Sequence, residues 1–172
     1  MYRYTKLARA IVAVLSPGIA LAAGDAVAQE KSLKEQLVGA WTLVSNYVER
    51  QDGTKIDRPN LKGVVIYSSD GKFALVNVSS DLPRLAANDR ARATPEEAKA
   101  VVAGSIAYFG SYSVDEANKV ITVNIEGSTF ANQVGGTDNK RVITLLTATE
   151  LRFTNPASQS GTKIHLVWKR AN

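Results

Sequence analysis

Few side chains in this sequence have the chemistry of metal ligands or nucleophiles. The chain has a single histidine, His165, and no cysteine. Transition metals bind histidine, cysteine and grouped carboxylates, so we expect no metal site. A serine nucleophile beside His165 would need a Gly-x-Ser-x-Gly turn, and neither that turn nor a phosphate-binding glycine pattern occurs. We therefore expect no cofactor, and we expect His165 on a solvated strand face with Lys163 and Val167.

Glu126 and Arg141 are the candidate catalytic residues. Polar and apolar residues alternate over 120–126, so Glu126 shares a strand face with Thr122 and Asn124. If the apolar face fills the interior, Glu126 is an ordinary surface carboxylate. If that face packs outside, Glu126 points inward and pairs with Arg141 on the next strand. In an enzyme, Glu126 or a tyrosine would act as acid or base, with Arg141 stabilising developing negative charge.

Aromatic residues indicate where a ligand would bind. Tyr108 and Tyr112 share a strand face with Gly110 between them, which leaves either a slot for a flat, apolar ligand or simple core packing. A few polar groups beside such a surface would orient the ligand. The candidate ligand-binding residues are Tyr67, Tyr108, Tyr112, Glu126, Phe130, Asn132 and Arg141.

These side chains are expected on a succession of short strands. Apolar–polar alternation predicts strands over 41–49, 63–67, 72–78, 107–114, 119–126, 140–147, 150–155 and 162–168. Eight antiparallel strands in sequence order either close or leave exposed edges. Closure at eight leaves an interior just wide enough for side chains or one small ligand. The expected fold is all-β, an eight-stranded (8–10) antiparallel up-and-down barrel.

Two helices accompany the strands in this prediction. A short helical lead-in is expected around 33–38. Thr94-Pro95-Glu96-Glu97 has the capping-box pattern with proline at the first helical position, so a second helix should run to about 102 or 103 and stop at Gly104. With 79–93 it forms a connection of roughly 25 residues, far longer than a hairpin loop. It must act as a structural plug or a mobile lid, and Val101, Val102 and Ile106 would be buried in either role.

The first 28 residues are typical of a secretory signal peptide. Arg3, Lys6 and Arg9 form a basic region, 10–23 is apolar, and Ala26-Val27-Ala28 is a cleavage site of the small-x-small kind. The apolar run is shorter than the ~20 residues of a spanning helix and is broken by proline and glycine. We expect cleavage after Ala28, a periplasmic or secreted protein, and no stable membrane insertion.

Cleavage would leave one domain, 29–172, without disulfides. Its formal charge would fall from +5 to +3, because three basic residues and Asp25 leave with the signal peptide. Nucleic acid is not an expected partner, since the densest basic stretch, Arg84, Arg90 and Arg92, is interrupted by acidic residues.

Several sequence blocks resemble the lipocalin-like domain family of small bacterial and fungal proteins. The blocks are Gly39-Ala40-Trp41, 65–73, 109–114, 126–135, Arg141 and 166–170. The resemblance implies a calycin-type barrel with Gly39 and Trp41 near its closed end and Lys169 or Arg170 lying against the indole, where a cation–π contact contributes ~0.5–1 kcal/mol. Members often carry a histidine on the strand before the Glu-x-Ser block. Here 120–126 has none, so no acid or base is inherited from it.

These observations together predict an exported, lipocalin-like barrel that binds a small, mostly apolar molecule in its interior. One alternative is an isomerase, cyclase or hydratase that uses the same pocket. Another is an envelope stress or assembly protein whose barrel is fully packed and whose outer surface contacts a partner. That last alternative requires a barrel without an internal cavity.

Overall fold

The structure is a computed structural model that describes residues 31–158 and 161–172. The signal peptide expected over 1–28 lies outside the described residues. Among the helices that the structure does describe, none is long and apolar enough to cross a membrane.

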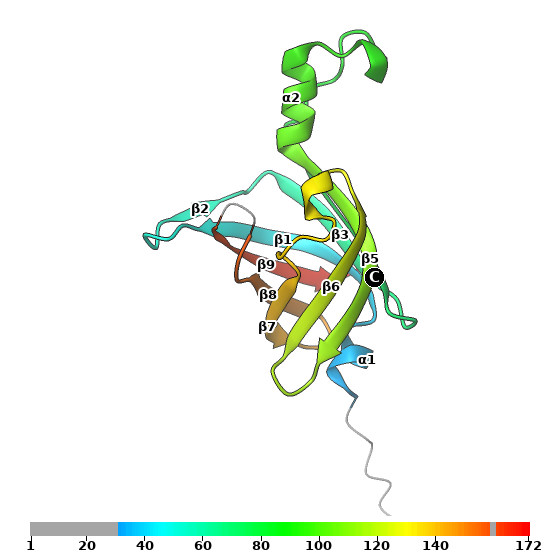
Figure 1. The fold of residues 1–172 in the computed structure, drawn as a ribbon, viewed down its shortest axis with the longest axis vertical. Coiled ribbons are helices and arrows are strands. Elements are labelled where there is room, and N and C mark those ends of the chain that lie inside the picture. The colour runs from blue at the N-terminus through cyan, green and yellow to red at the C-terminus, as the bar shows by residue number, and fades with distance from the viewer. Residues whose placement is uncertain (1–30, 159–160) are drawn as a thin grey trace, which may run out of the picture.

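Eight antiparallel strands form a closed barrel (Figure 1). They are β1 (Gly39–Glu49), β3 (Leu61–Tyr67), β4 (Lys72–Ser79), β5 (Ser105–Asp115), β6 (Val120–Ser128), β7 (Lys140–Leu146), β8 (Glu150–Asn155) and β9 (Lys163–Arg170). Each strand pairs with the next, and β9 returns to pair with β1. The expected fold class is confirmed, and strand ends agree to within about two residues. A further short strand, β2 (Lys55–Asp57), pairs with the last three residues of β1.

The short helix α1 (Leu33–Leu37) closes one end of the barrel. Ser32 and Glu35 form a reciprocal capping box at its start. The Glu116 carboxylate, from the β5–β6 turn, accepts hydrogen bonds from two further backbone N–H groups of the first turn. Leu37 is fully buried, and its carbonyl accepts a 2.8 Å bond from the Trp41 indole. Capping and burial together hold this otherwise marginal five-residue helix.

Arg170 lies over Trp41 at the same closed end. Its Cζ is 4.0 Å from the centre of the indole. Its guanidinium donates to three backbone carbonyls, those of Gln36, Val38 and Ala148. Arg170 therefore joins the last strand to α1 and to the β7–β8 turn, and it satisfies carbonyls left free where α1 ends.

The half of the barrel next to α1 is filled with side chains. Tyr67 contacts Tyr112 edge-on at 5.0 Å and stacks on Phe73 at 6.2 Å. Gly110 does not leave a slot, because a Cβ there would lie 1.9 Å from the backbone oxygen of Asn124. The close approach of β6 occurs beside a bulge, where Glu126 is an extra residue between two pairs of the β5–β6 ladder. The slot expected beside Gly110 is therefore absent, and Tyr112 packs in the core.

The opposite end is bordered by irregular segments. Only Val120–Thr122 of β6 pairs with β7, and the rest of β6 is flanked by a segment containing the 3-10 turn η2 (Ala131–Gln133). The backbone N–H of Val123 bonds to the carbonyl of Asn139 at 2.8 Å, which ties this segment to the strand. Polar groups of the segment consequently reach the barrel interior.

Helix α2 (Pro95–Gly104) begins with the expected capping box and ends at the expected glycine, but most of it lies beyond the barrel. No residue of α2 is buried, and Val102 is 78% exposed. The helix runs directly into β5 at Ser105, so it projects outward beyond the barrel (Figure 1). The expected burial of Val101 and Val102 and the plug role are wrong, since only the last turn of α2 reaches the barrel opening.

Candidate functional site

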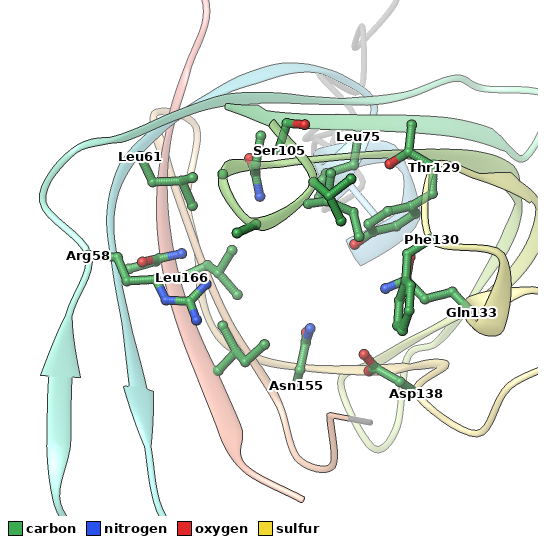
Figure 2. Close-up of a pocket in the computed structure, with 18 of the residues that line it drawn as sticks. Arg58, Leu61, Leu75, Ser105, Thr129, Phe130, Gln133, Asp138, Asn155 and Leu166 are labelled. Atoms are coloured by element: carbon green, nitrogen blue, oxygen red, sulfur yellow. The ribbon is translucent and has the colours of Figure 1, made fainter. Parts of the chain in front are cut away.

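The end of the barrel opposite α1 contains a cavity of about 570 Å³. This volume is within the range of small-molecule pockets. Its apolar wall comes from the inward faces of several strands: Leu61, Leu75, Ile106, Tyr108, Phe153, Ile164 and Leu166. The last turn of α2, Thr129 and Phe130 border the opening (Figure 2). The barrel is therefore packed in one half and hollow in the other.

Three buried asparagines, Asn46, Asn77 and Asn155, line the cavity from β1, β4 and β8. On β4 and β8 each asparagine is one inward-facing position closer to the opening than an apolar residue, Leu75 or Phe153. Asn46 lies opposite Leu166 on β9. Figure 2 shows the amide of Asn155 pointing into the cavity.

All three amides are incompletely hydrogen-bonded. The Oδ1 atom of each is enclosed and has no hydrogen-bond partner in the described chain. A half-turn about χ2 exchanges the oxygen and the nitrogen, so each amide can present a donor or an acceptor to the cavity. Buried polar groups in native proteins are nearly always paired, so three amides that each keep an unpaired oxygen make this part of the cavity wall unusually polar.

A buried ion pair joins the start of β7 to the segment that precedes it. The Arg141 guanidinium contacts Asp138 Oδ1 at 2.9 Å and the Tyr108 hydroxyl at 3.5 Å. Burial lowers the pKa of Arg141, but Tyr108 and Asp138 outweigh it, so the pKa lies above its usual value. Arg141 is thus a permanent cation that pairs with the Asp138 side chain at the cavity wall.

Two further arginines lie at the cavity opening, Arg58 between β2 and β3 and Arg90 in the 3-10 turn η1 (Arg90–Arg92). The backbone N–H of Arg58 donates to the Asn46 carbonyl at 3.1 Å, which holds this loop against β1. Figure 2 shows the Arg58 side chain directed toward the cavity. Two positively charged side chains therefore lie at the opening.

Only part of the predicted ligand-binding set meets at the cavity. Tyr108 and Phe130 line it. The buried Arg141 guanidinium contacts the hydroxyl of Tyr108. Tyr67 and Tyr112 belong to the packed half, where burial raises the pKa of each phenol and the Tyr112 hydroxyl donates to the Ser68 carbonyl.

Glu126 does not face the interior. Ile121, Val123 and Ile125 fill the barrel, which places Glu126 on the outer face, where it pairs with Lys72 at 2.9 Å. The Lys72 ammonium lowers the pKa of this carboxyl. The inward pair with Arg141 is therefore wrong.

Asn132 is exposed on the turn η2, and it is not among the residues that line the cavity. His165 lies on the outer face of β9, as expected, stacked on Tyr47 at 4.4 Å and 3.2 Å from Glu49 Oε2. It is 22% exposed in its side chain. Neither residue forms part of the cavity wall.

Six residues that line the cavity were not predicted as site residues from the sequence: the three asparagines, Asp138, Arg58 and Arg90. Asn77 and Asn155 carried a usable signal, because each continues an inward-facing alternation, after Leu75 and Phe153 respectively. Asn46 is shifted inward by a bulge between Leu43 and Ser45. The remaining three lie in loops, where periodicity gives no orientation.

The fold and site together define a hollow antiparallel β-barrel protein. The family model of the lipocalin-like domain matches residues 38–171, and the chain belongs to this family. The resemblance seen in the sequence is thereby confirmed. No curated protein matches the chain.

Two solved structures share the barrel form distantly. A de novo designed fluorescence-activating β-barrel is 12% identical with a TM-score of 0.39, over 83% of this chain and 100% of the design. The structure of EF1p2_mFAP2b bound to DFHBI is 12% identical with a TM-score of 0.37, over 80% of this chain and 95% of the other. Likenesses this remote say nothing about the ligand of this chain.

Proposed function

We propose that this protein binds a small amphipathic molecule in the open half of its barrel. The carrying observation is a cavity of about 570 Å³ whose apolar wall carries three buried asparagine amides, each with an unpaired oxygen. Apolar surface contributes affinity through burial, whereas the asparagine amides of the wall can form hydrogen bonds with a polar group of the ligand. The ligand is therefore not a plain hydrocarbon but an apolar body with a polar end.

The arrangement of the wall favours one orientation for this ligand. Leu75 and Phe153 lie deeper in the barrel than Asn77 and Asn155. An apolar body inserted first would contact the deeper side chains, and its polar end would stop beside the amides. The reverse orientation would place polar atoms among apolar side chains without partners, which is unfavourable.

We also propose that the protein acts outside the cytoplasm, in the periplasm or as a secreted protein. Support comes from the basic, apolar and small-residue regions of 1–28. Intact-mass measurement of the protein from its native cell checks this proposal. A mature chain beginning at Gln29 is expected, and a chain that keeps residues 1–28 would contradict it.

The structure weakens both alternatives. The enzyme alternative named Glu126 or a tyrosine as the acid or base, and the Glu126 carboxylate pairs with Lys72 on the outer face. Asp138, the acidic side chain that does line the cavity in the described chain, is engaged by Arg141. The packed-barrel alternative required no cavity, and the barrel contains one. Binding is the function that the site supports best.

Mass spectrometry of organic extracts tests the proposed binding. The protein is purified from its native compartment beside Ile164→Trp, which fills the opening, and Ile66→Trp, which adds the same ring to the outer face. We expect a stoichiometric compound with the wild type and with Ile66→Trp but not with Ile164→Trp. An empty wild-type protein that also fails to bind apolar probes would overturn the proposal.

A further inference from the structure

We infer that the ligand carries an anionic head group, held at the opening by Arg58 and Arg90 above the asparagine amides. This inference rests on the proposed function and specifies its ligand class as an anionic amphiphile. Three observations support it: the charged side chains around the cavity, the ion pairs that some of them already form, and the hydrogen-bond donors in the cavity wall.

Arg58 is placed for this role by its backbone. Its N–H donates to the Asn46 carbonyl at 3.1 Å, and its own carbonyl accepts from Leu61 N at 3.4 Å. These two backbone bonds hold Arg58 between Asn46 and Leu61, and both of these residues line the cavity. The guanidinium makes no ion pair within the described chain, and it extends toward the opening (Figure 2).

Arg90 reaches the opening from the long connection. The turn that carries it is capped by Asp89, whose carboxylate accepts from Ala91 N and pairs with Arg92 at 3.3 Å. Another carboxylate of the connection, that of Glu97, accepts backbone bonds from Ala86 and Thr94. Both carboxylates therefore already have partners within the connection. Arg90 lines the cavity and makes no ion pair among the described residues.

Acidic groups do not cancel this positive charge. Asp138 is the one acidic residue among those that line the cavity in the described chain, and Arg141 already pairs with it at 2.9 Å. Arg58 and Arg90 therefore leave an excess of two positive charges at the opening. A cationic head group would meet these arginines without a free carboxylate, whereas an anion gains charge-assisted hydrogen bonds.

The asparagines complete an anion site. The amide oxygen of Asn77 lies against Gly63, where a Cβ would be 1.8 Å away, so its nitrogen is left for the cavity. An N–H₂ group donates to carboxylate, phosphate or sulfonate oxygens alike. Two guanidinium groups and amide donors of the same cavity wall are thus available to one anionic group whose apolar body extends toward Leu75 and Phe153.

A matched pair of fluorescent probes tests the inference. Phenylnaphthylamine is neutral, and anilinonaphthalene sulfonate has the same two aromatic groups plus a sulfonate. We expect both to bind the wild type, the anionic probe about tenfold more tightly, in keeping with charge-assisted bonds. Arg58→Gln with Arg90→Gln should remove this preference, so that the variant binds the two probes with equal affinity. Arg50→Gln, which changes a charge in the β1–β2 turn away from the cavity, is the matched control.

The outcomes separate this inference from the function on which it rests. If phenylnaphthylamine binds as tightly as the anionic probe, or if Arg50→Gln lowers the preference as much as the double variant, the anionic head group is overturned while binding stands. If neither probe binds, or if Ile164→Trp binds both unchanged, the proposed function itself fails.

Displacement of the bound anionic probe identifies the anion. The competitors are a fatty acid, an alkyl phosphate and an alkylamine of one chain length. We expect either anion to displace the probe at concentrations about tenfold below the amine. The tighter of the two anions shows whether carboxylate or phosphate is preferred. An amine that competes equally overturns the inference.

Discussion

Gly63 and Asn77 lie directly opposite each other on β3 and β4, and the amide of Asn77 occupies the space that a side chain at residue 63 would take. A Cβ at Gly63 would lie 1.8 Å from Asn77 Oδ1 and 2.9 Å from the Val76 carbonyl oxygen. The absence of a side chain on one strand therefore sets the position of a cavity amide on the next.

Gly63→Ala should consequently disturb both stability and binding. The added methyl must displace the Asn77 amide and press on the backbone of Val76, which we expect to cost about 1–3 kcal/mol of unfolding free energy. Urea unfolding and titration with the anionic probe measure the two effects. In an Asn77→Ala background the cost should be smaller, because the two residues are in contact. Equal costs in both backgrounds would contradict the proposed contact.

Asn155→Leu should make the protein more stable and a poorer binder. The substitution removes an enclosed oxygen without a partner and replaces the amide by an apolar group of similar size. We expect a gain of about 1 kcal/mol in unfolding free energy and a weaker affinity for the anionic probe. Loss of stability would show that this amide is satisfied in the empty barrel. Thr154→Val, on the outer face of the same strand, controls for strand propensity.

Arg170→Gln should destabilise the closed end. The change removes the cation above Trp41 and most of the bonds to three backbone carbonyls. We expect a loss of about 2–4 kcal/mol, since the exposed carbonyls of α1 lose their partner. Thermal unfolding followed by circular dichroism measures it. Lys169→Gln changes the same charge on the exposed neighbour, and an equal effect there would assign the loss to net charge.

Tyr67 should make the protein sensitive to alkali. Burial raises the pKa of its phenol above the ordinary value of 10.0. In the unfolded chain the phenol ionises at about pH 10. The buried, un-ionised phenol therefore makes its full contribution to the unfolding free energy below pH ~10, and this contribution is lost as the pH rises toward the pKa of the folded state. Above pH ~10 the unfolding free energy should fall by up to about 1.4 kcal/mol per pH unit from this group. Tyr67→Phe should have a shallower alkaline slope, and identical slopes would contradict the assignment.

Glu126→Gln should leave ligand binding unchanged. Its carboxylate is on the outer face, paired with an exposed lysine, so its removal alters neither the cavity nor the core. Titration with both probes measures this, with Lys72→Gln as the variant that breaks the same pair. A loss of binding or turnover in Glu126→Gln alone would return this residue to the site.

The fold was predictable because its signals are local. Alternation located the strands, the Ser32 and Thr94 capping positions located the helices, and the family resemblance placed a basic residue against Trp41. Each of these depends on a few neighbouring residues or on one repeated pattern. The direction of α2 relative to the barrel has no such signal, since it depends on how Gly104 joins Ser105.

The site was less predictable because it depends on register. Strict alternation from Trp41 would point Asn46 outward, and the bulge between Leu43 and Ser45 reverses this. The same alternation showed that Glu126 and Ile125 point to opposite sides, but not which side is inside. Asp138 faces the cavity from an irregular segment, where only the folded backbone determines orientation.

Both described chain ends leave the barrel on the side away from the cavity. The Ala171 N–H bonds to the Ala40 carbonyl, and Arg170 grips the end of α1. A sensor chip, bead or reporter protein attached after Asn172 would therefore face the α1 end and leave the opening free (Figure 1). Immobilisation through this end would therefore leave the cavity opening facing the solution, where compounds can diffuse into it.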